Sequence, residues 1–278
     1  EVEFSRTAVY SFHAAAAERW SNGNIFLLGD AAHQMPPFMG QGMNSGCRDA
    51  ENLLWKINGV LKGLYKPKIL HTYETERKPH VARITRAAIK LGGVINAKSK
   101  FRALVRNATL RIQGYFKGKE NIFPIMNGNR LGQGVHNMPK IKDVSLERYY
   151  FNEISVRLND GRIQSTDKIL GKNFGMILND FEGNKKISDK YLEFLNKHNF
   201  KIINISNNHE QSNYDNYIAC EDTHSDMQIY CDKYDCNAVI LRPDKYVFDI
   251  FNFETDNLDE IVSSAIKNLQ ETAVFTPN

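Results

Sequence analysis

The chain has 278 residues, enough to bury a sizeable core and to form about two domains. Its hydrophobic content of 42% and charged content of 24% fit a soluble globular protein. No apolar run approaches the roughly 20 residues that a membrane span requires, which excludes a membrane-spanning protein. The net charge of +4 is small and gives no reason to expect a nucleic-acid partner.

Charge is distributed unevenly along the chain. Residues 77–119 contain many Lys and Arg and no Asp or Glu, whereas acidic residues outnumber basic ones from Ser206 onward. The basic stretch has two interpretations. It is a solvated helical face, the ordinary role of a charged run, or it faces an anionic ligand or surface.

The four cysteines are sparse for the length of the chain, which favours a reducing compartment and a cytoplasmic location over a disulfide framework. Three of them form a loose cluster with a histidine: Cys220, His224, Cys231 and Cys236. The cluster contains no C-x-x-C pair, and its spacings match no common zinc pattern, so no metal is expected.

The first predicted elements are two strands and a helix. Residues 6–14 have strand composition with partial alternation, and the uniformly apolar "NIFLLGD" at residues 24–30 indicates a buried strand, often a parallel one. From Gln41 the period changes to steps of three and four, which predicts a helix that ends near Gly63. Its apolar residues share one face: Met43, Cys47, Ala50, Leu54, Ile57 and Leu61.

A second helical region follows. Pro67 suits the first turn of a helix that carries "ILHTYETERK", and Pro79 is expected to kink or break that helix. The basic stretch then continues as a helix whose inner stripe is Val81, Ile84, Ala88 and Leu91. Residues 117–139 are rich in Gly, Asn and Pro without a clear period, which predicts a connecting loop.

The remainder, from about Leu146, indicates a separate small domain. It alternates predicted strands and helices in the order β-α-β and then β-β-α, which is the order of a thioredoxin-like domain. Ser188 is a plausible cap for its first helix. The segments concerned are the strands "FGMILND", "FKIINIS", "NAVILRP" and "YVFDIFN" and the helices "SDKYLEFLNKH" and "LDEIVSSAIKNLQ".

The most informative stretch is "FLLGDAAHQMPPFMGQGMNSG" at residues 26–46. A strand that ends in Gly-Asp places a carboxylate at the carboxyl edge of a sheet, where Asp30 can accept hydrogen bonds from the hydroxyls of a sugar or ribityl chain. The glycines that open the next helix let backbone N–H groups reach a ligand, and a helix start stabilises negative charge. The alternative is a turn whose glycines serve geometry alone.

The stretch "FLLGDAAHQMPPFMGQGMNSGCRDAENLLWKI" resembles the Gly-Asp motif and following helix of the class A FAD-dependent aromatic monooxygenases, the para-hydroxybenzoate hydroxylase superfamily. With "AVYSFHAAAAERW" and "TYETERKPH", it is most similar to the branch of the 3-(3-hydroxyphenyl)propionate hydroxylases. The resemblance covers residues 1–95 strongly and the remainder by pattern. It implies an α/β fold with α+β character: the C-terminal part of a flavoprotein hydroxylase FAD domain with long helices, followed by a thioredoxin-like domain.

The resemblance also implies roles for individual residues. Asp30 binds the ribityl part of FAD, Pro37 lies near the reactive edge of the flavin, and the start of the helix contacts the pyrimidine end of the ring. The implied cofactor-binding set is Gly29, Asp30, Pro37, Gly40, Gln41, Gly42, Met43 and Asn44. Tyr10, Phe12 and His33 are weaker candidates for the substrate side, with core or loop packing as the alternative. Trp55 is expected in the core, and Arg48 and Asp49 are expected to satisfy each other or neighbouring elements.

The implied reaction is hydroxylation of a phenolic ring with NAD(P)H and O2 through a flavin C4a-hydroperoxide. The catalytic work belongs to FAD, and no catalytic side chain is assigned. The family's Gly-x-Gly-x-x-Gly turn is absent, and so is the Asp-Gly segment that precedes the family's Gly-Asp motif, so we expect the chain to supply the isoalloxazine-side half of the site. The alternative is a truncated, non-catalytic remnant or interaction module.

The expected domains are a partial FAD-binding domain at residues 1–116, a connecting loop at 117–145 and a thioredoxin-like domain at 146–278. The place of the usual redox pair reads "NDFEGN", so disulfide exchange there is not expected. The expected partners are a phenolic small molecule, O2, and either a second copy in a homodimer or a separate N-terminal half.

Overall fold

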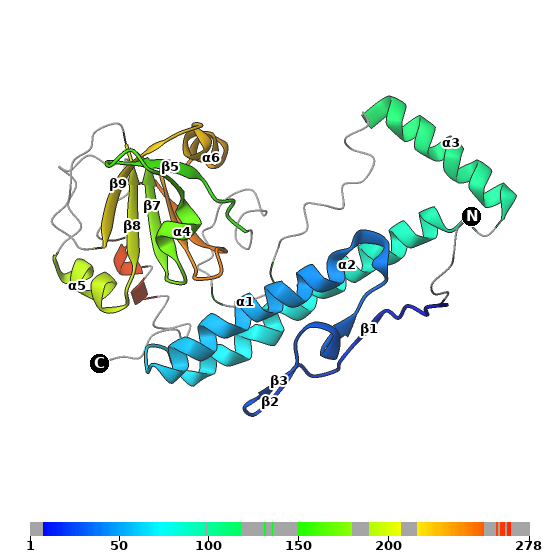
Figure 1. Cartoon of the computed structure of the whole chain (residues 1–278), viewed down its shortest axis with the longest axis horizontal. Helices are drawn as coiled ribbons and strands as arrows, with labels where there is room; N and C mark the ends of the chain where they lie inside the picture. Colours follow the sequence, from blue (N-terminus) through cyan, green and yellow to red (C-terminus); the bar gives the residue numbers. More distant parts are fainter. Residues whose placement is uncertain are drawn as a thin grey trace, which may run out of the picture. The chain divides into compact units, whose positions relative to one another are not determined.

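The computed structural model describes residues 8–97, 99–117, 131, 135, 150–179, 189–206, 216–252, 260, 262–264 and 266–267. The chain forms two compact units. Unit 1 comprises residues 1–51 and 74–128, and unit 2 comprises residues 52–73 and 129–278. The long helix α1 (Gln41–Leu61) is labelled in Figure 1. Its residues up to Glu51 belong to unit 1, and those from Asn52 belong to unit 2. Among the described residues, no helix has the length and apolarity needed to cross a membrane.

Unit 1 combines short strands with long helices. Its strands are only two residues long, and they form two antiparallel pairs, β1 with β4 and β2 with β3. One 3-10 turn lies between β3 and β4, and a second lies between β4 and α1. The elements besides α1 are β1 (Ala15–Ala16), β2 (Ser21–Asn22), β3 (Ile25–Phe26), η1 (Gly29–Ala31), β4 (His33–Gln34), η2 (Pro37–Met39), α2 (Thr72–Ile95) and α3 (Lys100–Lys117).

The two strands predicted near the start are not formed as expected. Residues 8–14 have no regular structure, and Val9 is 97% exposed. In "NIFLLGD" only Ile25 and Phe26 are extended, and they pair antiparallel with β2 instead of forming a buried parallel strand. The physical reason is that a strand is stable only beside partners that satisfy its N–H and C=O groups, and the described part of unit 1 offers two-residue partners.

Helix α1 has the predicted limits but buries a different face. Met43, Leu54 and Leu61 of the predicted apolar face are exposed. The buried residues follow a second period of three and four, and several of them are polar: Ser45, Asp49, Asn52, Leu53, Trp55 and Lys56. The hydrophobic pattern therefore found the helix but not its packed side, because the polar residues are buried with hydrogen-bond partners.

Helix α2 continues through Pro79 without a break, contrary to one of the two expectations for that residue. It is preceded by the 3-10 turn η3 (Pro67–His71), whose first position is the predicted Pro67. Its inner stripe is confirmed at Val81, Ile84 and Ala88, which are buried. A proline removes one backbone hydrogen bond, and the 24-residue helix retains its other bonds on both sides of Pro79.

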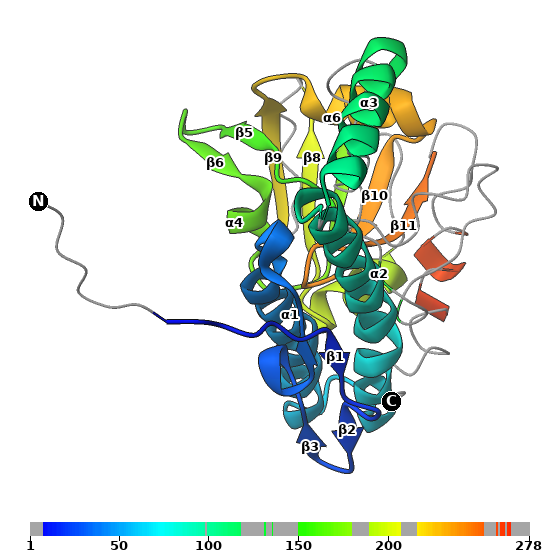
Figure 2. The ribbon, with the colours of Figure 1, turned by 90° about the vertical axis from the view of Figure 1, so that its right-hand side faces the viewer.

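Unit 2 contains a seven-stranded mixed sheet in the order β11-β10-β7-β8-β9-β5-β6 (Figure 2). Strands β7, β8 and β9 are parallel neighbours, and β10 lies antiparallel to both β7 and β11. The elements are β5 (Ser155–Leu158), β6 (Ile163–Ser165), α4 (Thr166–Leu170), β7 (Gly175–Asn179), α5 (Asp189–Lys197), β8 (Lys201–Ile205), β9 (Tyr217–Asp222), α6 (Asp226–Tyr234), β10 (Ala238–Leu241) and β11 (Val247–Phe251).

All four strands predicted for the C-terminal domain are present, and so is the helix α5 between the first two. The turn at Pro243-Asp244 joins β10 to β11 as expected. Strands β5, β6 and β9 and helices α4 and α6 were not predicted. The mixed helix and sheet content agrees with the predicted fold class. The thioredoxin-like assignment stays a prediction.

The core of unit 2 includes residues that precede the predicted domain. Trp55 of α1 and Tyr65 lie edge-to-face against Phe174, with ring centroids 5.6 and 6.3 Å away. Trp55 is 6% exposed, which confirms its predicted core position. Contacts of this kind place residues 52–73 in unit 2, although the sequence suggested a first domain that runs unbroken to residue 116.

Several predicted features lie outside the described residues. They are most of the loop at 117–145, the Ser188 cap and residues 180–184 of "NDFEGN". The closing helix is described only at residues 260, 262–264 and 266–267, all of which are helical.

Candidate functional site

The Gly-Asp turn is held against helix α1 by its backbone. Gly29 has a φ of +58°, a left-handed conformation that favours glycine, and its N–H donates to Asp49 Oδ2 at 3.1 Å. A Cβ added at Gly46 of α1 would lie only 3.3 Å from the Gly29 Cα, so the two backbones approach closely. These contacts fix the turn relative to the start of α1.

The turn presents Asp30 to solvent. This residue is the second of the 3-10 turn η1 (Gly29–Ala31), whose end is closed by the Ala32 N–H bonded to the Gly29 carbonyl at 2.9 Å. Asp30 and the next residue, Ala31, are exposed, while Ala32 and His33 are buried. An exposed carboxylate on a fixed turn is available to accept hydrogen bonds from a polyol.

The path from the turn to α1 is stiffened by a second 3-10 turn. Pro37 occupies its first position, where the missing N–H costs nothing. Gly40 then adopts a φ of +60°, and its N–H donates to the Pro37 carbonyl at 3.0 Å. The next residue, Gln41, begins α1. The sharp change of direction explains why glycine stands at position 40.

The first turn of α1 leaves its backbone N–H groups without intrahelical acceptors, as in every helix. Those groups belong to Gln41, Gly42, Met43 and Asn44, the positions that the family resemblance implies. Met43 and Asn44 are exposed, and a Cβ at Gly42 would meet no atom within 4 Å. The positive end of this 21-residue helix is therefore accessible. Position 42 has no side chain that would cover it.

Behind this face lies Asp49, which is fully buried. Its carboxylate accepts from the Gly29 N–H, from His33 Nε2 at 2.7 Å and from Arg77 Nε at 2.8 Å. Burial alone raises the pKa of Asp49, but the hydrogen bond from His33 and the Arg77 charge outweigh it and hold the pKa below its usual value. Asp49 is thus an ionised hub that joins the turn, β4 and α2.

Arg77 of α2 completes this buried network. It is fully buried, donates to the Ser45 carbonyl at 3.3 Å and also donates to His80 Nδ1. Arg48 does not take part, because its guanidinium donates to Gln41 Oε1 at 3.3 Å. The sequence left open whether Asp49 pairs with Arg48 or with a neighbouring element, and the structure gives it Arg77.

A second contact ties the entry segment to α2. The Trp20 N–H donates to Glu74 Oε2 at 2.9 Å, and Glu74 also pairs with Lys78 at 3.1 Å, one helical turn on. The Trp20 side chain is fully buried, with its ring 5.3 Å from that of His33. Glu74 and Arg77 both belong to the "TYETERKPH" segment, so that segment positions the site from α2.

The three residues suggested for the substrate side differ in their exposure to solvent. Tyr10 and Phe12 lie in the irregular segment 8–14 and are 67% and 60% exposed. His33 is buried, with Nε2 bonded to the Asp49 carboxylate, and its Nδ1 has no hydrogen-bond partner among the described residues. A substrate role for these residues stays a prediction.

Sequence reasoning missed the positions that support the site. Asp49 and Arg77 were not assigned to each other, and Glu74 was not singled out. One signal was present: polar residues at 45, 49, 52 and 56 repeat at steps of four, three and four, as a buried stripe does. Hydrophobic periodicity does not register such a stripe.

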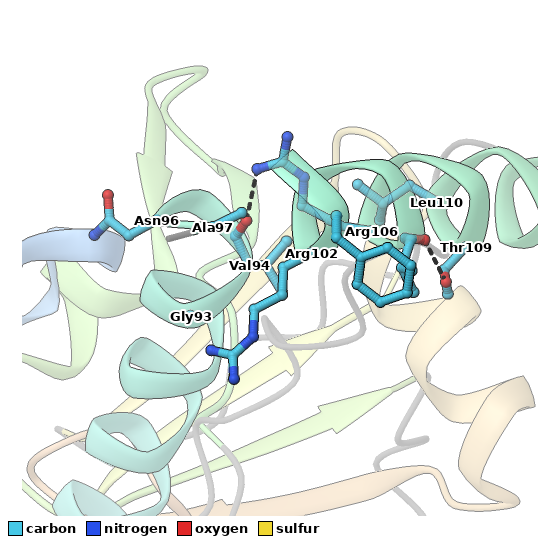
Figure 3. Close-up of a pocket in the computed structure, with 10 residues that line it drawn as sticks. Gly93, Val94, Asn96, Ala97, Arg102, Arg106, Thr109 and Leu110 are labelled. Carbon is cyan, nitrogen blue, oxygen red and sulfur yellow. Dashed lines mark hydrogen bonds between the residues drawn. The ribbon is translucent and has the colours of Figure 1, made fainter. Parts of the chain in front are cut away.

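A hollow of about 440 Å³ lies elsewhere in unit 1, between the end of α2 and the start of α3 (Figure 3). Arg106 crosses it and donates to the Val94 carbonyl at 3.0 Å, which closes the end of α2. Phe101 and Arg102 complete one wall. The hollow contains none of the residues implied for the flavin.

Comparison with known families gives two matches. Residues 1–88 match the FAD binding domain family, and residues 150–266 match the HcaD C-terminal domain family. The first match contains the Gly-Asp turn, the start of α1 and the Asp49–Arg77 network. The second contains the seven-stranded sheet.

Curated relatives are aromatic hydroxylases. The 3-(3-hydroxy-phenyl)propionate/3-hydroxycinnamic acid hydroxylase of Burkholderia cenocepacia is 28% identical over 253 residues, which are 88% of this chain and 47% of that protein. The probable NADH-specific resorcinol 4-hydroxylase of Rhodococcus jostii is 46% identical over 110 residues, 40% of this chain and 21% of that protein. The chain spans about half the length of the first of these relatives.

Solved structures share the fold. The flavin-dependent monooxygenase PieE in complex with FAD and substrate has a TM-score of 0.64 at 21% identity, over 93% of this chain and 50% of that chain. The anhydrotetracycline hydroxylase OxyS from Streptomyces rimosus has a TM-score of 0.66 at 18% identity, over 94% of this chain and 46% of that one. Each match again covers about half of the larger protein.

Proposed function

Because the chain is a relative of the FAD-dependent aromatic monooxygenases, we propose that it supplies the isoalloxazine-side half of an FAD site that hydroxylates a phenolic substrate. The observation that carries this proposal is the open face formed by Asp30 and the first turn of α1. The residues on that face are exposed or half-buried, and those behind it are held by the buried Arg77–Asp49 ion pair and the His33–Asp49 hydrogen bond.

The residues present fit the flavin-ring half of FAD. The Asp30 carboxylate accepts hydrogen bonds from ribityl hydroxyls. The free N–H groups of residues 41–44 hold the electron-rich end of the ring, where the helix dipole favours the negative charge of the reduced flavin. Gly42 leaves room for close approach, and the position proposed for Pro37 is beside the reactive edge of the flavin. Asp49 and Arg77 act through other groups: they hold Gly29 and the Ser45 carbonyl in place.

When bound, FAD supplies the redox and oxygen chemistry, with NAD(P)H as reductant and O2 as oxidant. The name of the Rhodococcus relative favours NADH. The substrate is a phenolic ring, since the named relatives act on hydroxyphenylpropionate and resorcinol. Tyr10 and Phe12 are available to contact it because their rings are exposed.

The nucleotide half of the site comes from other residues. The chain lacks a Gly-x-Gly-x-x-Gly turn, and it spans about half of the relatives, so the ADP portion requires an additional N-terminal half. That half, or a second copy of the chain in a homodimer, is the proposed protein partner. A cytoplasmic location belongs to the same proposal and is supported by the sparse cysteines.

The test is an FAD titration followed by flavin fluorescence and absorbance. It uses the 278-residue chain alone and the chain mixed with the N-terminal half of the Rhodococcus relative. We expect weak or no binding alone and clear binding with the added half. Asp30→Asn should weaken that binding at least tenfold, which is about 1.4 kcal/mol and within the range of a charge-assisted hydrogen bond.

Asp160→Asn is the matched control, because Asp160 is an exposed aspartate of unit 2. It should leave FAD affinity unchanged. Equal affinities for the wild-type chain and Asp30→Asn would overturn the site assignment. Failure of every mixture to bind FAD would instead favour the non-catalytic alternative.

A further inference from the structure

The end of helix α6 carries a backbone motif that brings two cysteines together. Asp235 adopts the left-handed conformation, with a φ of 51° and a ψ of 49°, and its N–H bonds to the Cys231 carbonyl. The N–H of Cys236 donates to the same carbonyl at 3.2 Å. The Cys236 bond is the six-to-one bond of a Schellman helix end, and the Asp235 bond is the five-to-one bond of an αL helix end. In a Schellman end the side chains of the first and sixth residues commonly meet.

Here those two side chains are thiols. The two thiols are close enough for the Cys231 thiol to act on the Cys236 sulfur, and the Ala238 N–H acts on the same sulfur. Both cysteines belong to the same buried cluster of unit 2, with exposures of 4% and 6%. The hydrogen bond from Cys231 lowers the pKa of Cys236, while the pKa of Cys231 is raised by the same bond and by burial.

The other two cysteines lack this arrangement. Cys220 is also fully buried, and burial raises its pKa to about 12. Its thiol donates to the Asn204 carbonyl at 3.7 Å. Cys47 is exposed on α1, in unit 1. Of the four, only Cys231 and Cys236 are brought together at one helix end, which is the adjacency that an attacking and a resolving thiol need.

We propose that Cys231 and Cys236 form a reversible redox pair that closes to a disulfide when the protein meets hydrogen peroxide. The Cys236 thiolate attacks one peroxide oxygen, the O–O bond breaks, and hydroxide leaves as water, which converts the sulfur to a sulfenic acid. The Cys231 thiol then attacks that sulfur and expels a second water. Two thiols and one peroxide thus yield one disulfide and two waters.

The pair is selective for a small oxidant because of its burial. Hydrogen peroxide contains only two heavy atoms, whereas oxidised glutathione must bring a sulfur that carries a tripeptide up to the thiolate. With exposures of 4% and 6%, the two thiols exclude the larger reagent while the helix is intact. The exposed Cys47 has no such protection and should react with both.

The experiment maps the cysteines after oxidation. The native 278-residue chain is treated with hydrogen peroxide, unfolded in N-ethylmaleimide, and cut with trypsin and a glutamate-specific protease. Cleavage after Glu221 separates Cys220 from Cys231, and cleavage after Lys233 separates Cys231 from Cys236. A disulfide therefore links peptides 222–233 and 234–245, and the linked mass is two hydrogen atoms below the sum of the two.

We expect that linked peptide to rise with peroxide, to disappear with dithiothreitol and to be absent after treatment with oxidised glutathione. Cys220→Ser should leave it unchanged, and Cys231→Ser should abolish it. Complete alkylation of Cys231 and Cys236 under conditions that oxidise Cys47 would overturn the proposal. So would a link from Cys236 to Cys220. Both results come from the wild-type chain, so they hold even if a variant folds poorly.

Discussion

Asp49→Asn is the change that tests the buried network most directly. The substitution keeps the shape of the side chain and removes its charge, so Arg77 stays buried opposite a neutral amide. The asparagine oxygen can accept from one of the three donors that now share the carboxylate, and its NH2 group faces the other donors. Gly29 and His33 are the partners that compete for that oxygen.

The expected loss follows from the burial of both partners. Asp49 and Arg77 are each 0% exposed, and their atoms Oδ1 and Nε are 2.8 Å apart. Removing one partner of such a pair destabilises a protein by about 3–5 kcal/mol, because an uncompensated charge is left in the interior. We therefore expect the unfolding free energy of unit 1 to fall by about that amount, a large share of a typical domain's stability.

The two tryptophans of the chain permit an assay of each unit. Trp20 is in unit 1 and Trp55 is in unit 2, so Trp55→Phe leaves Trp20 as the reporter of unit 1 in a urea titration. Asp30→Asn, the neighbouring exposed carboxylate, is the matched control and should shift the midpoint little. The dependence of the unfolding free energy on pH in the acid range gives a second readout. The ionised Asp49 contributes stability above its ordinary pKa of 3.8 and loses it as the pH falls through the lowered pKa, so the two proteins should converge in acid.

A double-mutant cycle with Arg77→Met separates the pair from the rest of the network. The double variant should lose less unfolding free energy than the sum of the losses of the two single variants. The difference, which is the coupling energy, should exceed about 1 kcal/mol. A loss below about 1 kcal/mol for Asp49→Asn, or strict additivity in the cycle, would refute the argument that a buried ion pair fixes this turn.

The remaining predictions concern packing and pH. Gly92→Ala should destabilise unit 1 by about 1–3 kcal/mol in the same urea titration, because the added Cβ would lie 2.2 Å from the Phe38 ring; Gly93→Ala, whose Cβ meets nothing within 4 Å, should be neutral or stabilising by up to about 1 kcal/mol. Burial lowers the pKa of His198 from 6.5 to about 4, with the Lys197 charge adding to it. The unfolded chain therefore takes up a proton that the folded chain does not, and unit 2 should lose at most about 3 kcal/mol between pH 6.5 and pH 4. His198→Gln should flatten that part of the pH curve when unfolding is followed by Trp55 fluorescence, and an unchanged slope would contradict the assignment.

Local pattern predicted the elements whose hydrophobic residues pack within a continuous sheet. The strands β7, β8, β10 and β11 each bury nearly every residue, so an apolar run and its flanking turns were sufficient signals. The limits of α1 followed from the same kind of reasoning, since Gly40 and Gly63 with positive φ flank it.

Sequence pattern failed where contacts with residues far away in the chain decide the conformation or the packed face of an element. "NIFLLGD" has the composition of a buried strand, yet Ile25 is 69% exposed and only two residues pair with β2. The packed face of α1 was also beyond reach, because Asp49 and Asn52 are buried through contacts 28 and 192 residues away in sequence, with Arg77 and Asp244. No window along the chain contains both members of such a pair.

The hydrophilic stripe of α1 has a mechanical consequence. An apolar helix face can shift or rotate slightly against another apolar surface with a small change in free energy, because dispersion contacts are non-directional. Carboxylate–guanidinium and amide–carboxylate bonds tolerate no such freedom, since a shift of one residue separates donor from acceptor. Asp49 therefore fixes the position of α1 relative to Gly29 to within the tolerance of a hydrogen bond. A ring bound at the first turn of α1 would be held at a defined distance from the Gly-Asp turn.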